Sequence, residues 1–277
     1  MPMWLGVSIA LIYGVVVGSF LNVCIWRLPR DESLVSPGSH CPKCNTLLRA
    51  WDLIPLFSFL IQRCKCRYCK TPISWRYFTV ESLTGVFFAL TYLRFGWSLD
   101  TLVFALFGAS LIATFLIDME HYIIPDQLNL FGIGIGVARD VYGIVIGERD
   151  WHTNIFGASI PIPQSVVGIL VCGGIFLLIA VISYYIFKKE GIGGGDIKLA
   201  AAIGATIALG PSLLSFFIAV TLGSVIGVAL MASNKKSRKD YLPFGPFMVV
   251  GAMVAMFYGR QLIDLYLNYV GLGAAGG

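Results

Sequence analysis

Long apolar runs alternate with shorter polar connections along most of the chain. The runs are about 20 residues long, the length that an α-helix needs to cross the hydrocarbon core of a bilayer. The pattern therefore predicts about eight transmembrane helices. They lie at approximately Trp4–Ile25, Tyr77–Phe95, Leu99–Ile117, Gln127–Ile146, Val166–Phe187, Ile197–Leu209, Leu213–Ala232 and Phe247–Val270. The run Ile197–Leu209 is the shortest, and its Ala and Gly content favours close packing within a bundle.

The composition agrees with a membrane protein. Hydrophobic residues make up 57% and charged residues 13% of the 277 residues, and the mean hydropathy is +0.80. A soluble domain of this size does not need so much apolar surface. The first run has neither the basic start nor the small-residue cleavage site of a signal peptide, so we expect it to be retained as a span. The predicted fold class is an all-α polytopic membrane protein.

Lysine and arginine gather in alternate connections, those that follow the first, fifth and seventh runs. These hold Arg27, Arg30, Lys43, Arg49, Arg63, Lys65, Arg67, Lys70 and Arg76, then Lys188 and Lys189, then Lys235, Lys236, Arg238 and Lys239. By the positive-inside rule these connections are cytoplasmic and both termini lie outside. The net charge of +5 is then a matter of topology and gives no reason to expect nucleic acid. The basic connections could also hold anionic membrane lipid.

The connection after the first helix, residues 31–76, is the one sizeable soluble insertion. Its two C-x-x-C pairs are Cys41 with Cys44 and Cys66 with Cys69. Pairs on short turns at a separation of about 20 residues are typical of a structural zinc site, because four thiolates can close a tetrahedron around one ion. A segment this small cannot hold a core without such a metal.

Two other states of these cysteines stay open. A disulfide pair is disfavoured by the reducing cytoplasm, to which the positive-inside rule assigns the insertion. An iron–sulfur cluster would use the same four thiolates. Cys64 precedes the second pair and is a spare thiol that could exchange with Cys66 as a ligand.

Two acidic stretches lie at the cytoplasmic ends of apolar runs. Residues 116–126 have the sequence LIDMEHYIIPD, and Gly191–Lys198 has the sequence GIGGGDIK. Asp118 closes its run at a helix C-terminus, where the dipole disfavours a negative charge. Asp196 follows a string of glycines, which permit strained turns and the close approach of another chain. An ionisable residue at the membrane is a candidate functional residue.

Asp118 and Asp196 could meet in the bundle and would then share a proton. Such a pair lets one carboxylate deprotonate a water while the other protonates a peptide carbonyl or leaving amine. A plainer interpretation is a flexible hairpin in which Asp196 merely caps the next helix. The positions expected to shape the site are Gly193, Gly194 and Gly195 beside Asp196, and Pro243 and Gly245 in the turn before the last run. A turn of that kind is tolerated in a membrane only against protein or a water-filled cavity.

Together these motifs resemble the type IV prepilin peptidases of bacteria, which are GxGD-type aspartic proteases of the inner membrane. The resemblance runs nearly end to end. It rests on GSFLNVCIWRLPR, the paired C-x-x-C insertion, WDLIPLFSFL, ISWRYFTVE, IDMEHYIIPD, GIGGGDIKLA and LPFGPF. It implies that Asp118 and Asp196 are the catalytic pair. One departure is Cys64, because many members that also methylate have a glycine there.

The resemblance implies two activities. The first is cleavage of the leader of prepilins and pseudopilins at the cytoplasmic face of the inner membrane. The second is methylation of the new N-terminal amine with S-adenosyl-L-methionine. The chain would then comprise a first transmembrane helix (1–30), a zinc-binding insertion carrying the methyltransferase part (31–76), and a membrane peptidase part (77–277). The residues that bind the methyl donor stay unassigned.

Three alternatives remain. A peptidase without methyltransferase activity would fit the cysteine at position 64. A scaffold protein would keep the fold without catalysis, but it would not need both aspartates. A proton-coupled transporter would use its acidic residues as a relay, and acids are then expected near the bilayer midplane rather than at one boundary.

Overall fold

The structure is a computed structural model, and it describes residues 2–150, 152–155, 158–188, 191–233 and 242–271. This part of the chain is mostly helical, which confirms the predicted fold class, and one two-stranded hairpin is added to the helices. The chain divides into two compact units, Met1–Ile117 and Asp118–Gly277.

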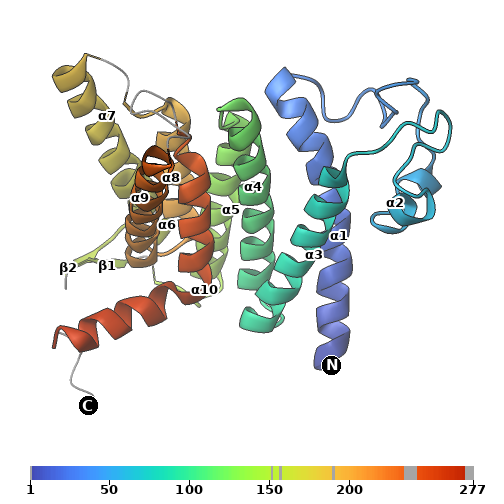
Figure 1. Cartoon of the computed structure of the whole chain (residues 1–277). Coiled ribbons are helices and arrows are strands. Elements are labelled where there is room, and N and C mark those ends of the chain that lie inside the picture. The colour runs from blue at the N-terminus through green and yellow to red at the C-terminus, as the bar shows by residue number, and fades with distance from the viewer. Residues whose placement is uncertain (1, 151, 156–157, 189–190, 234–241, 272–277) are drawn as a thin grey trace. The chain divides into compact units, whose positions relative to one another are not determined.

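The first unit is built on two long helices, α1 (Met3–Arg27) and α3 (Trp75–Phe95), which lie side by side (Figure 1). Their backbones approach closely at two glycines of α1. A Cβ added at Gly14 would lie 2.7 Å from the carbonyl oxygen of Thr84, and one at Gly18 would lie 2.8 Å from the Cα of Glu81. Small residues at such crossings allow tight helix packing in a membrane.

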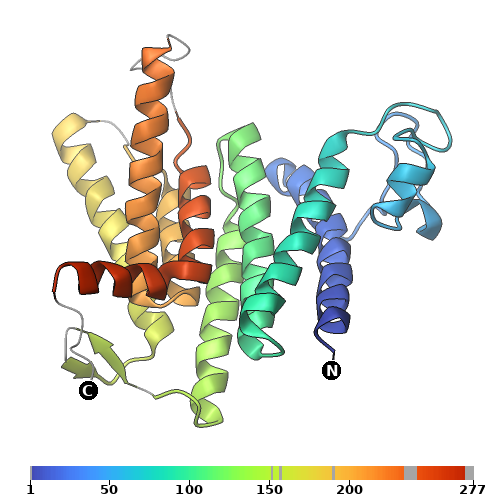
Figure 2. The same ribbon diagram turned by 60° about the horizontal axis from the view of Figure 1, so that its bottom comes forward.

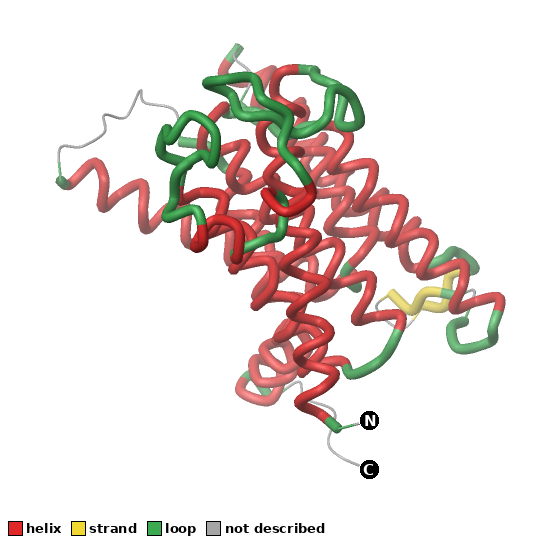
Figure 3. The backbone as a smooth tube through the Cα atoms, turned by 90° about the vertical axis from the view of Figure 1, so that its right-hand side faces the viewer, coloured by secondary structure: helices red, strands yellow, loops and turns green. Residues whose placement is uncertain are grey.

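The insertion between α1 and α3 consists of loops and three short helical turns (Figure 3). The turns are η1 (Leu28–Arg30), η2 (Ala50–Asp52) and α2 (Phe57–Ile61). After α3, helix α4 (Leu99–His121) completes the first unit and carries the chain into the second.

The second unit contains the elements that follow α4. Its elements are α5 (Asp126–Val145), β1 (Thr153–Ile155), β2 (Ala158–Ile160), α6 (Gln164–Gly168), the π-helical turn η3 (Ile169–Gly173), α7 (Gly174–Phe187), α8 (Gly194–Thr206), α9 (Leu209–Ala232) and α10 (Gly245–Tyr269). The strands pair antiparallel, with Thr153 opposite Ile160. Helix α9 packs on α10 (Figure 2), and α8 packs on α5 and η3.

Helix α8 lies inside the second unit. Every residue from Leu199 to Thr206 is buried. Gly204 makes this possible on one side, because it packs backbone to backbone against Gly168, and a Cβ at either glycine would meet the carbonyl group of the other. The Ala and Gly content noted in the sequence thus serves close packing.

A buried carboxylate, which the apolar pattern does not reveal, joins α5 to α6. Asp140 is 4% exposed and accepts hydrogen bonds from the Arg149 guanidinium at 3.2 Å and from the Ser165 amide and hydroxyl at 2.8 and 2.9 Å. The Ser165 amide is in the first turn of α6, where backbone N–H groups lack partners within the helix. Asp140 therefore links the end of α5 to the start of α6, across the connection that contains β1 and β2.

Six helical segments of the described chain are long and apolar enough to cross a membrane: Met3–Arg30, Leu99–His121, Asp126–Val145, Gln164–Ile186, Leu209–Ala232 and Gly245–Tyr269. The chain is therefore a multi-pass membrane protein. Two expected spans are not among the six. Helix α3 is 21 residues long but carries polar side chains such as Glu81. Helix α8 has 13 residues, which extend about 20 Å, whereas the hydrocarbon core is about 30 Å thick. The count of eight spans stays a prediction.

Candidate active site

The two C-x-x-C pairs form matching turns. The amide of Cys41 donates to the carbonyl of Thr46 at 3.0 Å, and the amide of Cys66 donates to the carbonyl of Thr71 at 2.8 Å. The residue that follows each pair takes a left-handed conformation, with φ of 53° at Asn45 and 60° at Lys70. Each turn thereby directs two sulfurs toward the same point.

The four sulfurs fit a tetrahedral metal ion. The Sγ atoms of Cys41, Cys44, Cys66 and Cys69 all lie within 4.8 Å of one another, and those of Cys41 and Cys69 are 3.8 Å apart. A zinc–sulfur bond of about 2.3 Å in a tetrahedron requires sulfurs about 3.8 Å apart. All four are free thiols, so the cluster is not a pair of disulfides.

Neighbouring threonines favour the thiolate form that binds metal. The Thr71 hydroxyl, 3.2 Å from the Cys69 sulfur, lowers the pKa of that thiol to about 6. Thr46 lowers the pKa of Cys44 in the same way. Burial instead raises the pKa of the Cys41 thiol to about 11. Cys64 lies outside the cluster and has a left-handed φ of 60°, a conformation that suits glycine.

Asp52 holds the second cysteine turn in place, a role that the sequence did not indicate. It is 9% exposed, and its carboxylate accepts from the Arg67 guanidinium at 2.9 Å, the Tyr68 hydroxyl at 2.9 Å and the Gln62 amide at 3.3 Å. Arg67 and Tyr68 are the two residues between Cys66 and Cys69. The WDLIP segment is thus bound directly to the cysteine cluster.

The structure brings the two predicted aspartates together within the second unit. Asp118 lies in the last turn of α4 and is 4% exposed, and Asp196 lies in the first turn of α8 and is 6% exposed. They are close enough for the charge of Asp196 to act on Asp118. Both carboxyl groups are thus buried in the same part of the second unit.

Each aspartate also lies beside the backbone amide of a predicted neighbour. The amide of Gly193 is near the carboxyl group of Asp196, and the amide of Gly245 is near that of Asp118. Gly193 is the N-cap of α8, and Asp196 lies in the first turn after it, the position that the plainer interpretation gives it. Capping does not require burial beside a second carboxyl group, and it leaves Asp118 unexplained.

Ile124 packs between the two glycine-bearing turns. A Cβ added at Gly195 would lie 3.0 Å from the Cβ of Ile124, and one at Gly245 would lie 3.1 Å from its Cδ1. The same Cβ at Gly245 would lie 2.5 Å from the Oδ2 of Asp118. Pro243 is buried two residues earlier. Gly195 and Gly245 therefore leave little room for a side chain, whereas a Cβ added at Gly194 would have no atom within 4 Å.

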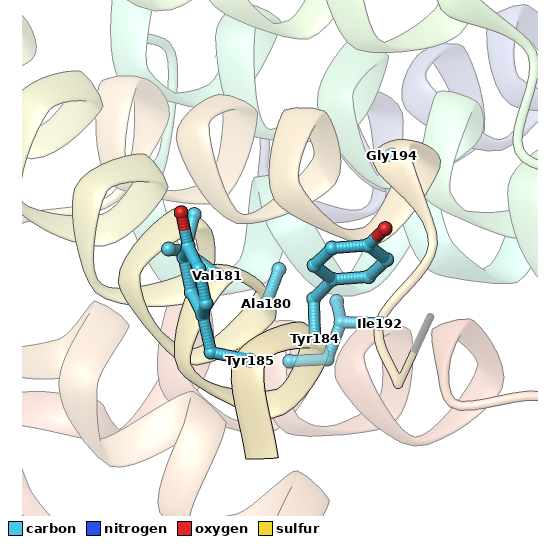
Figure 4. A pocket seen from close by; sticks show the side chains of 6 residues that line it. All are labelled: Ala180, Val181, Tyr184, Tyr185, Ile192 and Gly194. Atoms are coloured by element: carbon cyan, nitrogen blue, oxygen red, sulfur yellow. The ribbon is translucent and has the colours of Figure 1, made fainter. Parts of the chain in front are cut away.

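A pocket of about 450 Å³ opens beside the start of α8. It is lined by Ala180, Val181, Tyr184, Tyr185, Ile192 and Gly194 (Figure 4). The first four belong to the last turns of α7, and Gly194 is two residues from Asp196. The two tyrosine rings and their aliphatic neighbours make a mostly apolar lining, and the tyrosine hydroxyls can form hydrogen bonds.

Two known protein-family patterns match the chain, one over the cysteine insertion and one over both aspartates. The pattern of the bacterial peptidase A24 N-terminal domain matches residues 12–95, and that of the type IV leader peptidase family matches residues 105–228. The chain belongs to the type IV leader peptidase family. The first match contains all four clustered cysteines, and the second contains Asp118 and Asp196.

Relatives of this family align with the chain over most of its length. A prepilin leader peptidase/N-methyltransferase of Bacillus subtilis is 31% identical over 94% of this chain and 98% of its own length. Proteins of the same description from Legionella pneumophila and Neisseria gonorrhoeae are 31% and 34% identical, over 96% and 90% of this chain and 96% and 89% of their own lengths. No solved structure matches the chain.

Proposed function

We propose that this member of the type IV leader peptidase family cleaves the leader of type IV prepilins or pseudopilins and then N-methylates the new N-terminus. The observation that supports cleavage most directly is the pair of buried carboxyl groups, Asp118 and Asp196, at adjoining helix ends. Support for methylation comes from relatives that carry both activities in their names and align over nearly their whole length.

In the proposed hydrolysis the two aspartates share the proton transfers. One carboxylate takes a proton from a water molecule, whose oxygen attacks the carbonyl carbon of the scissile peptide. The other carboxyl group protonates the carbonyl oxygen, and the proton taken from water leaves with the amine. The amides of Gly193 and Gly245 would orient the carboxyl groups. The glycines at the start of α8, Gly193–Gly195, would let an extended substrate backbone approach them.

The substrate is proposed to place its apolar segment in the bilayer and its leader at the cytoplasmic boundary. Asp118 and Asp196 both lie at helix ends, which suits a cut at that boundary better than a proton relay through a transporter. The pocket beside Gly194 would receive an apolar side chain near the cut. The proposed location is the bacterial inner membrane, with this site facing the cytoplasm and both termini outside, as the basic connections indicate.

Two cofactors are proposed, a structural zinc ion and a methyl donor. Cys41, Cys44, Cys66 and Cys69 would hold a zinc ion, which would supply structural stability to the insertion. S-adenosyl-L-methionine would supply the methyl group. Residues 31–76 would carry the methyltransferase part, and residues 77–277 would carry the peptidase part.

The decisive experiment is the intact mass of a prepilin after incubation with the purified protein and S-adenosyl-L-methionine. We expect loss of the leader and gain of one methyl group. Asp118→Asn and Asp196→Asn should each slow cleavage by roughly 10²- to 10⁴-fold, the usual contribution of a general acid or base. Asp264→Asn, on the exposed end of α10, is the matched control and should cleave normally. Normal cleavage by Asp196→Asn would exclude the aspartate pair.

A further inference from the structure

A buried carboxylate lies in the seam between α1 and α3 of the first unit. Glu81 is 7% exposed. Its Oε2 accepts the backbone N–H of Leu56 at 2.8 Å, and the hydroxyl of Ser19 lies near its carboxylate. No lysine or arginine in the described part of the chain forms an ion pair with it. Buried carboxylates normally have a cationic partner, because desolvation of a charge is costly.

A second unmatched acceptor lies in the same seam. Asn22 is 2% exposed, and its Nδ2 donates to the carbonyl oxygens of Gly18 at 3.3 Å and Tyr77 at 3.2 Å. Two acceptors around one end of the amide identify that end as the nitrogen. The Oδ1 at the other end has no hydrogen-bond partner. Buried amide oxygens normally accept a hydrogen bond, so a bound group with an N–H or O–H donor would satisfy Asn22 here.

The two acceptors face the same seam within about one helical turn. Ser19, which lies near Glu81, precedes Asn22 by three residues on α1. Tyr77, which binds Asn22, precedes Glu81 by four residues on α3. Residues at these spacings lie on one face of a helix. Gly18 lies between them, because its carbonyl oxygen accepts the Asn22 amide and a Cβ added to it would lie 2.8 Å from the Cα of Glu81.

The backbone that completes this seam is strained. Leu56 has φ of 60° and ψ of −51°, in the positive-φ range that residues other than glycine rarely adopt. This conformation directs its N–H to Glu81. Strained residues persist where the surrounding structure fixes them, and they gather at functional sites.

We propose that this site binds the N-terminal ammonium group of the cleaved pilin and that Glu81 accepts the proton that the ammonium must lose before it is methylated. This inference rests on the methyltransferase half of the proposed function. A primary ammonium has three N–H donors and a positive charge, which match a carboxylate and an amide oxygen. We name this group of Glu81 and Asn22 the amine site.

The step balances as follows. The ammonium gives one proton to Glu81, and the freed lone pair of the nitrogen attacks the methyl carbon of a methylsulfonium donor. The nitrogen–carbon bond forms as the carbon–sulfur bond breaks, and the bonding pair returns to sulfur. The product is a secondary ammonium and a neutral thioether, and the proton on Glu81 passes to water.

The test uses a peptide with the sequence of a pilin N-terminus that already lacks its leader, so that methylation no longer depends on cleavage. Glu81→Gln keeps an oxygen to accept the N–H of Leu56 but removes the charge. We expect the full-length Glu81→Gln protein to bind the free-amine peptide roughly 10-fold or more weakly. We expect methyl transfer at saturating donor to slow by roughly 10²- to 10⁴-fold. Glu32→Gln, an exposed glutamate of the same unit, is the matched control and should behave as the native protein.

Two further measurements separate the amine site from a structural role. An N-acetylated peptide should bind weakly to the native protein, and Glu81→Gln should not weaken it further. Zinc content and leader cleavage by Glu81→Gln report that the chain is folded. Methylation by the native protein but equal peptide binding and methylation by Glu81→Gln would overturn the amine site and leave the proposed function intact. Absence of methylation by the native protein would overturn the methyltransferase function, and the amine site with it.

Discussion

Gly245 offers a sharp test of the carboxyl pair, because a single methyl group there acts on Asp118 directly. Gly245 is the first residue of α10 and is buried. Its φ is not in the left-handed range, so alanine fits the backbone. The obstacle is steric, since the new Cβ would lie 2.5 Å from the Oδ2 of Asp118. We predict that Gly245→Ala displaces this carboxylate and suppresses leader cleavage.

The size of the effect follows from the distances. Ordinary contact with a Cβ begins at 3.4 Å, so the Oδ2 of Asp118 must move by about 0.9 Å. Ile124 cannot take up the strain, because its Cδ1 would itself be only 3.1 Å from the new methyl group. A displacement of about 1 Å in a reacting group can lower a rate by about 100-fold. Alanine gains about 1 kcal/mol of helix propensity over glycine, so we expect the stability of the fold to change little.

The assay is the rate of leader removal from a prepilin in detergent, followed by mass, with zinc content and thermal unfolding as checks of folding. Gly134→Ala in α5 is the matched control, because a Cβ there would have no atom within 4 Å. We expect the control to cleave at the native rate and to be slightly more stable. A Gly245→Ala protein that is folded and cleaves at the native rate would show that Asp118 does not react from this position.

Three further predictions concern the cysteine insertion and the connection after α5. Cys41→Ser should lower zinc content measured by metal analysis, and methylation should fall before cleavage does, because the metal holds the insertion. Cys64→Gly should stabilise the insertion by about 1 kcal/mol in denaturant unfolding. A φ of 60° costs a non-glycine residue roughly 1–2 kcal/mol, and the greater conformational entropy of glycine in the unfolded chain offsets part of the relief. A higher methylation rate in this variant would show that Cys64 limits methyl transfer. Asp140→Ala should destabilise the chain by about 3 kcal/mol in thermal unfolding, because it removes a buried carboxylate that accepts from the Ser165 amide, the Ser165 hydroxyl and one N–H of Arg149.

The sequence predicted the long helices well, because a bilayer imposes both their length and their apolar character. The weakest predictions were the two segments that depart from that rule. Helix α3 carries polar side chains on the face it shares with α1, and α8 has only 13 residues inside the second unit. Their stability comes from neighbouring helices, and such packing leaves little trace in a hydropathy pattern.

The candidate site could be predicted where its chemistry depends on residue type and spacing. The cysteine turns and both aspartates are of this kind. The groups that position them are not, because their roles arise from contacts between distant segments. Asp52 meets the second cysteine turn, and Ile124 packs against two glycine turns. Neither has a sequence signature, since a buried aspartate and an exposed one look the same in the chain.

The contacts of Asp52 link the cysteine cluster to the amine site through a short chain of residues. Arg67 and Tyr68, inside the second cysteine pair, bind Asp52 at the end of η2. Four residues later the N–H of Leu56 reaches Glu81. Loss of the metal would loosen the cysteine turns first, then Asp52, and then the strained Leu56 that depends on its surroundings. The amine site would lose a donor that holds its carboxylate, which explains why zinc removal is expected to affect methylation before cleavage.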